Sequence, residues 1–125
     1  MTTPILNRRR HERFALPAAY TPVLVETKQG SYEGHSYDIS EGGVQFELDD
    51  AIPAGEQVWI ALTLPATTTP DPVDRTVAAV GNIIWVDTSE PGPVRMAAAF
   101  TRFATEADRT RLLEQLSARG LRRAA

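Results

Sequence analysis

Apolar residues recur at every second position in several separate stretches of the chain. In residues 57–64 (QVWIALTL) every second residue from Val58 onward is aliphatic, and Val44, Phe46 and Leu48 repeat the pattern upstream. A period of two is that of a β-strand with one buried face. These stretches are too short to stand alone, because a strand is stable only when its apolar face is covered by other elements. The chain is therefore predicted to be built mainly from short strands.

Four further stretches have the composition of strands, namely residues 20–27 (YTPVLVET), 32–39 (YEGHSYDI), 75–86 (RTVAAVGNIIWV) and 94–103 (VRMAAAFTRF). They are rich in β-branched and aromatic residues. Residues 28–31 (KQGS) are the expected turn of a hairpin, and residues 65–74 (PATTTPDPVD) an exposed loop. Gly34 lies inside a strand, which predicts a bulge or a close backbone approach there, and Gly81 inside another strand is expected to allow a bend.

Only the C-terminal part of the chain has helical signals. Thr105 is a preferred N-cap residue, and Asp108 three residues later resembles the second half of a capping box. Gly120 stands where a helix-ending glycine is expected, and three leucines within residues 112–116 form one apolar stripe. We therefore expect a mainly β fold: a six-stranded antiparallel split β-barrel with one C-terminal α-helix packed on it.

The composition excludes several classes of protein. A chain of 125 residues is long enough for one domain with a real core. The absence of cysteine excludes disulfides, thiolate nucleophiles and thiolate metal sites, and it suits the reducing cytoplasm, where we expect the protein. No apolar run approaches the roughly 20 residues that span a bilayer. The N-terminus also lacks the apolar region of a signal peptide, because arginines follow Ile5 and Leu6 at once.

Positive charge is concentrated in residues 8–13 (RRRHER). Four of the 13 basic residues fall there, against one of the 16 acidic residues, whereas the whole chain has a net charge of −3. Arginine makes bidentate bonds to phosphate or to a guanine edge and also stacks on rings, so the run is a candidate anion site. The alternative is a solvated tail that aids solubility, since charge runs are common and unspecific.

A second candidate element is the loop that contains Asp38, Ser40, Gly42 and Gly43. It brings together a carboxylate, a hydroxyl and a double glycine. The carboxylate can accept hydrogen bonds from the Watson–Crick edge of guanine, and the glycines let backbone approach a ligand. By itself the pattern D-x-S-x-x-G is also typical of an Asp/Ser-stabilised turn between two strands.

Taken together, the two elements resemble the motifs of the PilZ domain family, bacterial receptors for the second messenger cyclic di-GMP. Arg9 and Arg13 match the family's R-x-x-x-R motif just before the first strand, and residues 38–43 match its D-x-S-x-x-G motif. Residues 81–85 (GNIIW) and 96–100 (MAAAF) resemble the family's glycine-to-tryptophan strand and its last core strand. The chain departs from the pattern where many members have a glycine before this phenylalanine, since three alanines stand there and the local curvature of the strand could differ.

The resemblance implies roles for individual residues. Arg9 and Arg13 would bind the phosphates and guanine faces of cyclic di-GMP, and Asp38 and Ser40 would bind the polar edge of one guanine. Gly43, with Gly42 beside it, would keep the loop open to the base. Arg8, just before the paired motif, could stack on a second, intercalated cyclic di-GMP.

The remaining polar and aromatic residues suggest no other chemistry. His11 and His35 have no metal-ligand spacing and are expected at the surface, so we predict no metal and no cofactor. Trp59 and Trp85 are predicted to pack in the core, and Trp85 is also a candidate to line the ligand site. The arginines at 119, 122 and 123 favour the dipole of the helix C-terminus or supplement the anion site.

Three functions fit these features. The first is a stand-alone cyclic di-GMP receptor that signals to an unidentified effector protein, as in motility or biofilm control, through ordering of its N-terminal arm. The second is a PilZ-like scaffold for motility or pilus machinery that does not bind nucleotide. The third, binding of single-stranded nucleic acid, lacks aromatic platforms in a basic groove, so we expect no DNA or RNA partner. An enzyme is not expected, because no nucleophile–base pair, P-loop or metal cluster is present in the sequence.

The expected organisation is simple. Residues 1–7 are predicted to be a flexible leader, residues 8–120 a single PilZ-like domain and residues 121–125 a tail. The protein is expected to be a monomer or weak homodimer without membrane insertion.

Overall fold

A computed structural model describes residues 14–15, 21–64, 75–118 and 122–123 of the chain. Within these residues eight strands and one helix follow one another: β1 (Phe14–Ala15), β2 (Pro22–Thr27), β3 (Gly30–Ser40), β4 (Gly43–Leu48), β5 (Gln57–Thr63), β6 (Thr76–Asp87), β7 (Val94–Phe103), α1 (Glu106–Ala118) and β8 (Arg122–Arg123). The predicted leader, the arginine run, His11, the loop 65–74, Gly120 and the rest of the tail lie outside the described residues.

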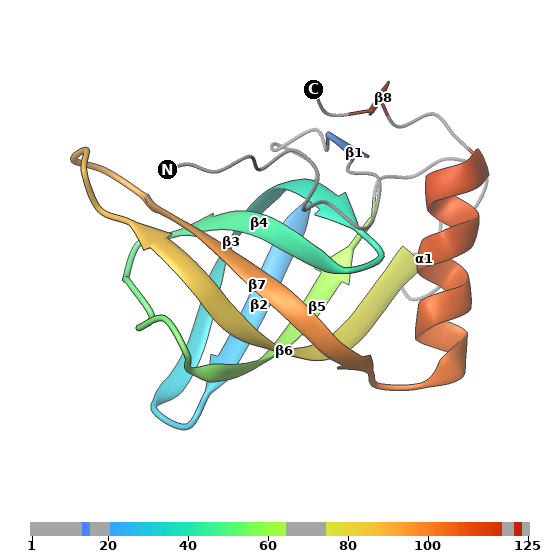
Figure 1. The fold of residues 1–125 in the computed structure, drawn as a ribbon, viewed down its shortest axis with the longest axis horizontal. Coiled ribbons are helices and arrows are strands. Elements are labelled where there is room, and N and C mark those ends of the chain that lie inside the picture. Colours follow the sequence, from blue (N-terminus) through green and yellow to red (C-terminus); the bar gives the residue numbers. More distant parts are fainter. Residues whose placement is uncertain (1–13, 16–20, 65–74, 119–121, 124–125) are drawn as a thin grey trace, which may run out of the picture.

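Six antiparallel strands form a closed barrel, which confirms the predicted fold class. The strands follow the order β2-β5-β6-β7-β4-β3, and a further pairing of β2 with β3 closes the ring. The helix α1 stands beside the barrel against β6 and β7 (Figure 1). Within the described residues no helix is both long enough and apolar enough to span a membrane.

The barrel interior is filled by the side chains that the period-two pattern placed on one face. All three apolar residues of β4 and all alternate aliphatic residues of residues 57–64 are buried. From the helix, Leu112 is fully buried and Leu116 packs against the same core. The hydrophobic effect thus drives barrel closure and helix docking together, because one apolar cluster includes residues from both.

The prediction that both tryptophans lie in the core is wrong. The side chain of Trp59 is 47 % exposed and that of Trp85 is 37 % exposed. Trp59 alternates with Val58 and Ile60, which point inward, so it must point outward. On the outer surface the Arg102 guanidinium lies 5.4 Å from the centre of the Trp59 ring, in a cation–π contact.

Strand β3 is long because it changes partner on one edge. Its first part pairs with β2, up to His35 opposite Pro22, whereas its last part pairs with β1. A β-bulge between Ser36 and Asp38 marks the change. The bulge was predicted at Gly34; there the structure has the predicted alternative, a close backbone approach, because a Cβ atom on Gly34 would collide with the Glu47 carbonyl.

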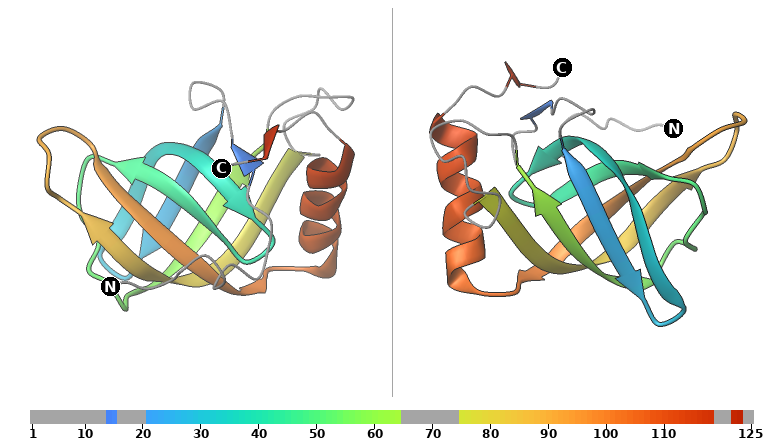
Figure 2. Two further views of the ribbon diagram at one scale, coloured as in Figure 1. Left: turned by 45° about the horizontal axis from the view of Figure 1, so that its top comes forward. Right: turned by 180° about the vertical axis from the view of Figure 1, so that it is seen from behind.

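The two shortest strands lie together at the end of β3. Strand β1 pairs antiparallel with β3 and also with β8, so that Phe14 is opposite both Ile39 and Arg123. Figures 1 and 2 show β1 and β8 side by side over the end of the barrel at which β3 turns into β4. A strand from before β2 and a strand from after α1 thus pair with each other.

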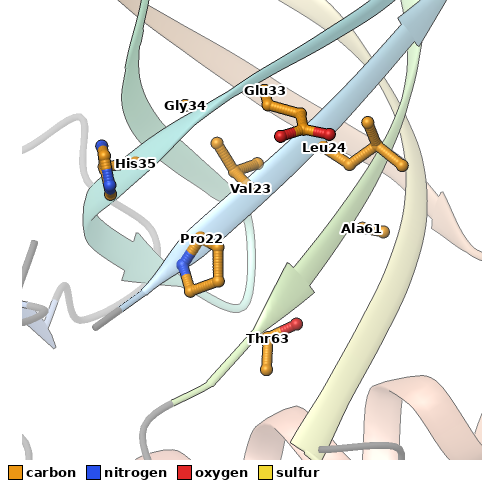
Figure 3. A pocket seen from close by; sticks show the side chains of 8 residues that line it. All are labelled: Pro22, Val23, Leu24, Glu33, Gly34, His35, Ala61 and Thr63. Carbon is orange, nitrogen blue, oxygen red and sulfur yellow. The ribbon is translucent and has the colours of Figure 1, made fainter. Parts of the chain in front are cut away.

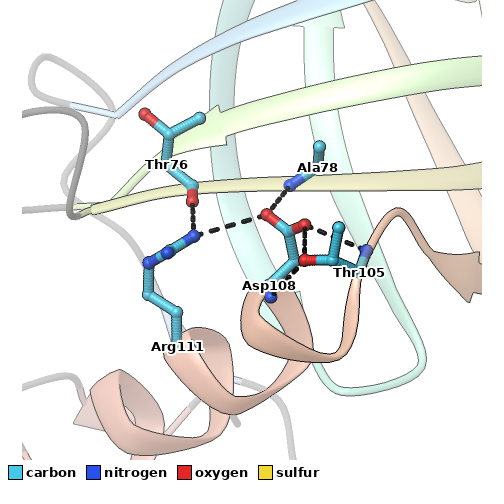
Figure 4. Close-up of polar contacts among 5 residues, drawn as sticks. All are labelled: Thr76, Ala78, Thr105, Asp108 and Arg111. Atoms are coloured by element: carbon cyan, nitrogen blue, oxygen red, sulfur yellow. Dashed lines mark hydrogen bonds and ion pairs between the residues drawn. The ribbon is translucent and has the colours of Figure 1, made fainter.

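The start of α1 has the predicted capping box (Figure 4). The Thr105 hydroxyl donates to Asp108 Oδ2 (2.6 Å) and accepts from the Asp108 backbone N–H (3.1 Å), and the Thr105 N–H donates to the same carboxylate. The other oxygen of Asp108 accepts the backbone N–H of Ala78 in β6 (3.0 Å). One carboxylate therefore both caps the helix and attaches it to the barrel.

Candidate ligand-binding site

Two of the predicted site residues lie near the end of β3, on the side of the strand that faces away from the core. Ile39 is fully buried in the core, and its neighbours Asp38 and Ser40 alternate with it along the strand. Asp38 is half-buried, and Ser40 is 4 % exposed. The period of two thus places the carboxylate and the hydroxyl on the face opposite the core.

The loop after Ser40 is held by backbone hydrogen bonds. The Gly42 N–H donates to Ser40 Oγ (3.1 Å), and the Gly42 carbonyl accepts from the Phe100 N–H in β7 (2.9 Å). Gly43 has no room for a side chain, because a Cβ atom there would collide with the carbonyl of Ala98. This glycine therefore lets β4 begin close against β7, a packing reason that the sequence motif alone does not reveal.

Small side chains continue the outer face beyond the loop. Gly43 is opposite Ala99, and one row further Gln45 is opposite Ala97. Ala97 is in turn opposite the half-exposed Trp85 in β6. Asp38 and Trp85 belong to the same cross-strand row and are three strand spacings apart, about 14 Å. The row thus has a carboxylate at one end and an indole at the other, with the buried Ala97 between them.

The arginines of the N-terminal motif lie outside the described residues, but the strand that follows them does not. Phe14 is opposite Ile39 and Ala15 is opposite Asp38. The strand that directly follows the arginine run in the sequence therefore lies beside the residues that lead into the acidic loop. The two motifs are about 25 residues apart in the sequence, and only the pairing of β1 with β3 places the residues after the first motif next to the second.

Sequence reasoning missed one ion pair at the loop. Glu41 lies between Ser40 and Gly42, and its Oε2 atom accepts from Arg109 Nη2 (2.7 Å) and Nε (3.1 Å). Arg109 belongs to the first turn of α1, 68 residues away in the chain. No local pattern signals such a contact; only the docking of α1 beside the loop reveals it.

The structure also has a cavity of about 580 Å³ elsewhere on the barrel (Figure 3). It lies across β3, β2 and β5 and is lined by Pro22, Val23, Leu24, Glu33, Gly34, His35, Ala61 and Thr63. Its lining includes one carboxylate and none of the predicted site residues, so it does not favour a phosphate. His35 is exposed there, as predicted. Among the described residues no cluster of His, Cys, Asp or Glu could hold a metal ion.

The chain belongs to the PilZ domain family. The family model, described as PilZ domain, matches residues 7–118, which is most of the chain. This confirms the resemblance seen in the two motifs. A search among curated proteins found no match.

Solved structures with the same fold include three PilZ-type proteins. The PilZ domain with c-di-GMP of YcgR from Escherichia coli is 16 % identical with a TM-score of 0.64, over 88 % of this chain and 90 % of that one. The K. pneumonia MrkH–c-di-GMP complex is 20 % identical with a TM-score of 0.68, over 88 % of this chain and 50 % of that one. Bacillus subtilis inhibitor of motility (MotI/DgrA) is 18 % identical with a TM-score of 0.63, over 95 % and 59 %. The chain thus spans 59 % of the length of MotI and 50 % of the length of MrkH.

Proposed function

We propose that this protein is a cyclic di-GMP receptor that binds the dinucleotide on the outer barrel face between the arginine run and the loop 38–43. Family membership supports this proposal, as do the c-di-GMP complexes of YcgR and MrkH, which share the fold. The observation that supports it most directly is the register of β1 with β3. Because Arg13 directly precedes Phe14, a long guanidinium side chain that starts there has the end of β3 within reach.

The chemistry of the two motifs is complementary to the ligand. Arg9 and Arg13 bind the two phosphates and the faces of the guanines, because a guanidinium makes paired bonds to oxygen and also stacks. Asp38 accepts from the N–H groups of one guanine. Ser40 accepts the Gly42 N–H and retains its own hydroxyl hydrogen to donate. Gly42 and Gly43 bring backbone rather than side chains to the base.

The outer face continues the site away from the loop. The small side chain of the partly exposed Ala99 leaves room for a planar base, and the exposed indole of Trp85 stacks on it at the far side. Arg8 adds a second stacking surface for an intercalated ligand, which gives two cyclic di-GMP per chain. Calorimetric titration measures this number, and a stoichiometry of one would reject the role of Arg8.

Signalling follows from the charges of the arm. Four guanidiniums within residues 8–13 repel one another, and a dianion that bridges them to the loop replaces repulsion with hydrogen bonds worth about 1.5–3 kcal/mol each. Ordering costs about 1–2 kcal/mol per residue, so only a polydentate ligand can fix the arm. The ordered arm then presents a new surface to an effector protein.

A scaffold that binds proteins without nucleotide is the second candidate. The exposed Trp59 with Arg102 over its ring favours it, because tryptophan and arginine are enriched at the centres of protein interfaces. The name of MotI, an inhibitor of motility, suggests the same kind of process.

Titration with cyclic di-GMP, GMP and a short oligonucleotide separates these functions. We expect micromolar or tighter binding of the cyclic dinucleotide and much weaker binding of GMP. Absence of binding would favour the scaffold. Preference for the oligonucleotide, with affinity that falls steeply as salt rises, would instead indicate a nucleic-acid-binding protein.

A further inference from the structure

The ion pair between Glu41 and Arg109 joins the candidate ligand loop to the helix. Two N–H groups of one guanidinium converge on a single carboxylate oxygen, at 2.7 and 3.1 Å. The side chains are 45 % (Arg109) and 29 % (Glu41) exposed, so the contact lies at the surface but is not fully solvated. Glu41 also directly follows Ser40, which places its charge beside the proposed ligand.

The helix holds Arg109 in place through its neighbours (Figure 4). Asp108 accepts from the Ala78 N–H of β6, and Arg111 Nη1 donates to the Thr76 carbonyl (2.7 Å). Residues on both sides of Arg109 are thus fastened to the barrel. The anchored turn fixes the position from which the Arg109 side chain starts, and so keeps its charge within reach of the loop.

A carboxylate at position 41 is a disadvantage for a loop that receives a dianion. Like charges within about 10 Å repel at physiological salt, and partial burial weakens the screening. The guanidinium of Arg109 cancels this charge at hydrogen-bond distance. The loop can then present Asp38 and Ser40 to a guanine without a second, uncompensated carboxylate next to the phosphates.

We propose that Arg109 is a positioning residue of the cyclic di-GMP site, which neutralises Glu41 and links ligand binding to the docking of α1. The inference rests on the proposed function and extends it to a residue outside both motifs. Coupling is reciprocal, so a ligand that is favoured by the Arg109–Glu41 contact also favours that contact. The first turn of α1 should therefore be more stable in the bound protein.

The C-terminal strand β8 lies beside the strand that follows the arginine run. After α1 the chain reaches β8, which pairs with β1, the strand that follows the arginine run. The segment from α1 to β8 thus contacts the loop through its beginning and the arm-bearing strand through its end. This arrangement allows the segment from α1 to β8 to transmit ligand binding to a partner protein.

Affinity measurements on the full chain test the proposal. Arg109→Ala should weaken cyclic di-GMP binding about three- to fivefold at low salt, and the loss should shrink as salt rises. Glu41→Gln combined with Arg109→Ala should bind within about twofold of the unaltered protein, because the repelling carboxylate is gone. Arg95→Ala is the matched control: it breaks a similar Arg–Glu pair, Arg95–Glu47 (3.2 Å), and should leave the affinity unchanged.

Hydrogen exchange provides a readout of the coupling. The ligand should slow exchange in the first turn of α1, and Arg109→Ala should abolish this protection while melting temperature changes little. Equal affinities for Arg109→Ala and Arg95→Ala, or no rescue in the double variant, would overturn the inference. If the unaltered protein binds no cyclic di-GMP, the proposed function itself fails, which is a different result.

Discussion

Two arginine–glutamate pairs on the same side of the barrel differ in what they connect. Arg95 and Glu47 are directly opposite each other on neighbouring strands, and Arg95 also lies 5.6 Å from the centre of the Tyr37 ring. Arg109 and Glu41 join a loop to a helix that are not neighbours in the sheet. The first pair adds to a ladder that backbone hydrogen bonds already hold, whereas the second joins two elements that share no backbone ladder.

The surroundings of Arg95 reinforce this contrast. Asp87 is opposite Arg95 on its other side. Hydrogen bonds from the hydroxyl and the backbone N–H of Ser89 hold the pKa of Asp87 below its ordinary value, and the charge of Arg95 adds to the effect. The single guanidinium therefore faces two carboxylates, and so does that of Arg109, whose Nη1 atom lies 3.6 Å from Glu106 Oε2. The loop end differs because β1, which directly follows the arginine run in the sequence, pairs with β3 there.

Removal of the Asp108 carboxylate, which fastens the helix turn that carries Arg109, should have the largest effect on stability. Asp108→Ala deletes the helix cap and leaves the Ala78 N–H without its partner, and the carboxylate is only 8 % exposed. We expect a loss of about 3 kcal/mol in the free energy of unfolding, measured by urea titration. Glu106→Ala, in the same turn but 81 % exposed, is the control and should change stability by less than about 0.5 kcal/mol. Similar losses in both variants would mean that Asp108 does not fasten the helix.

Gly43→Ala tests the packing of the loop against β7. The added Cβ would meet the Ala98 carbonyl, part of a backbone that cannot move without disturbing the barrel. Overpacking of this kind costs about 1–3 kcal/mol, seen as a lower melting temperature. Gln57→Ala, at an exposed position of β5, serves as the control. Wild-type stability in Gly43→Ala would show that the loop has room, and would assign the glycine to the ligand alone.

The strands were predictable because their alternation is a local property of the sequence. The buried faces of β4 and β5 and the capping box of α1 follow from residues within one element. The same alternation also places Trp59 on the outer face, between two inward-facing residues. Its large apolar side chain suggested burial instead, and that expectation was wrong. A β-bulge lies between Ile83 and Trp85. It interrupts the alternation of inward and outward side chains, so periodicity alone could not place Trp85.

The parts of the site that the sequence could not supply depend on long-range pairing. Strands β1 and β8 have two residues each, too few to show any period. The contact of Glu41 with Arg109 depends on where the whole helix docks. Composition and motif thus indicate which residues could bind an anion, whereas tertiary structure decides which of them share a face.

Substitution of the arginines in the N-terminal motif compares the two ends of the face most directly, because the effect is measured as affinity for the ligand. Arg9→Ala and Arg13→Ala should each weaken cyclic di-GMP binding about tenfold or more, since each removes charge-assisted bonds to the ligand. Circular dichroism and melting temperature should stay unchanged, because the apolar core is built from residues between Val23 and Leu112. Arg95→Ala should bind like the unaltered protein. Unchanged affinity in both motif variants would contradict the assignment of the site.

The smallest effect is expected from substitutions in β8. They test whether a third element contributes positive charge at the loop end of the face. Ala15 is opposite both Asp38 and Arg122, whereas Phe14 is opposite Ile39 and Arg123. In the backbone register, position 122 thus lies in the row of Asp38 and position 123 in the row of the buried Ile39. Arg122→Ala should therefore weaken cyclic di-GMP binding about two- to threefold at low salt, as expected for one solvated charge, and Arg123→Ala should not.

Calorimetry on the two single variants makes the comparison. Equal losses in both would mean that only the net charge of the tail matters, and that the loop end differs from the Arg95 end by its two motifs and its helix alone.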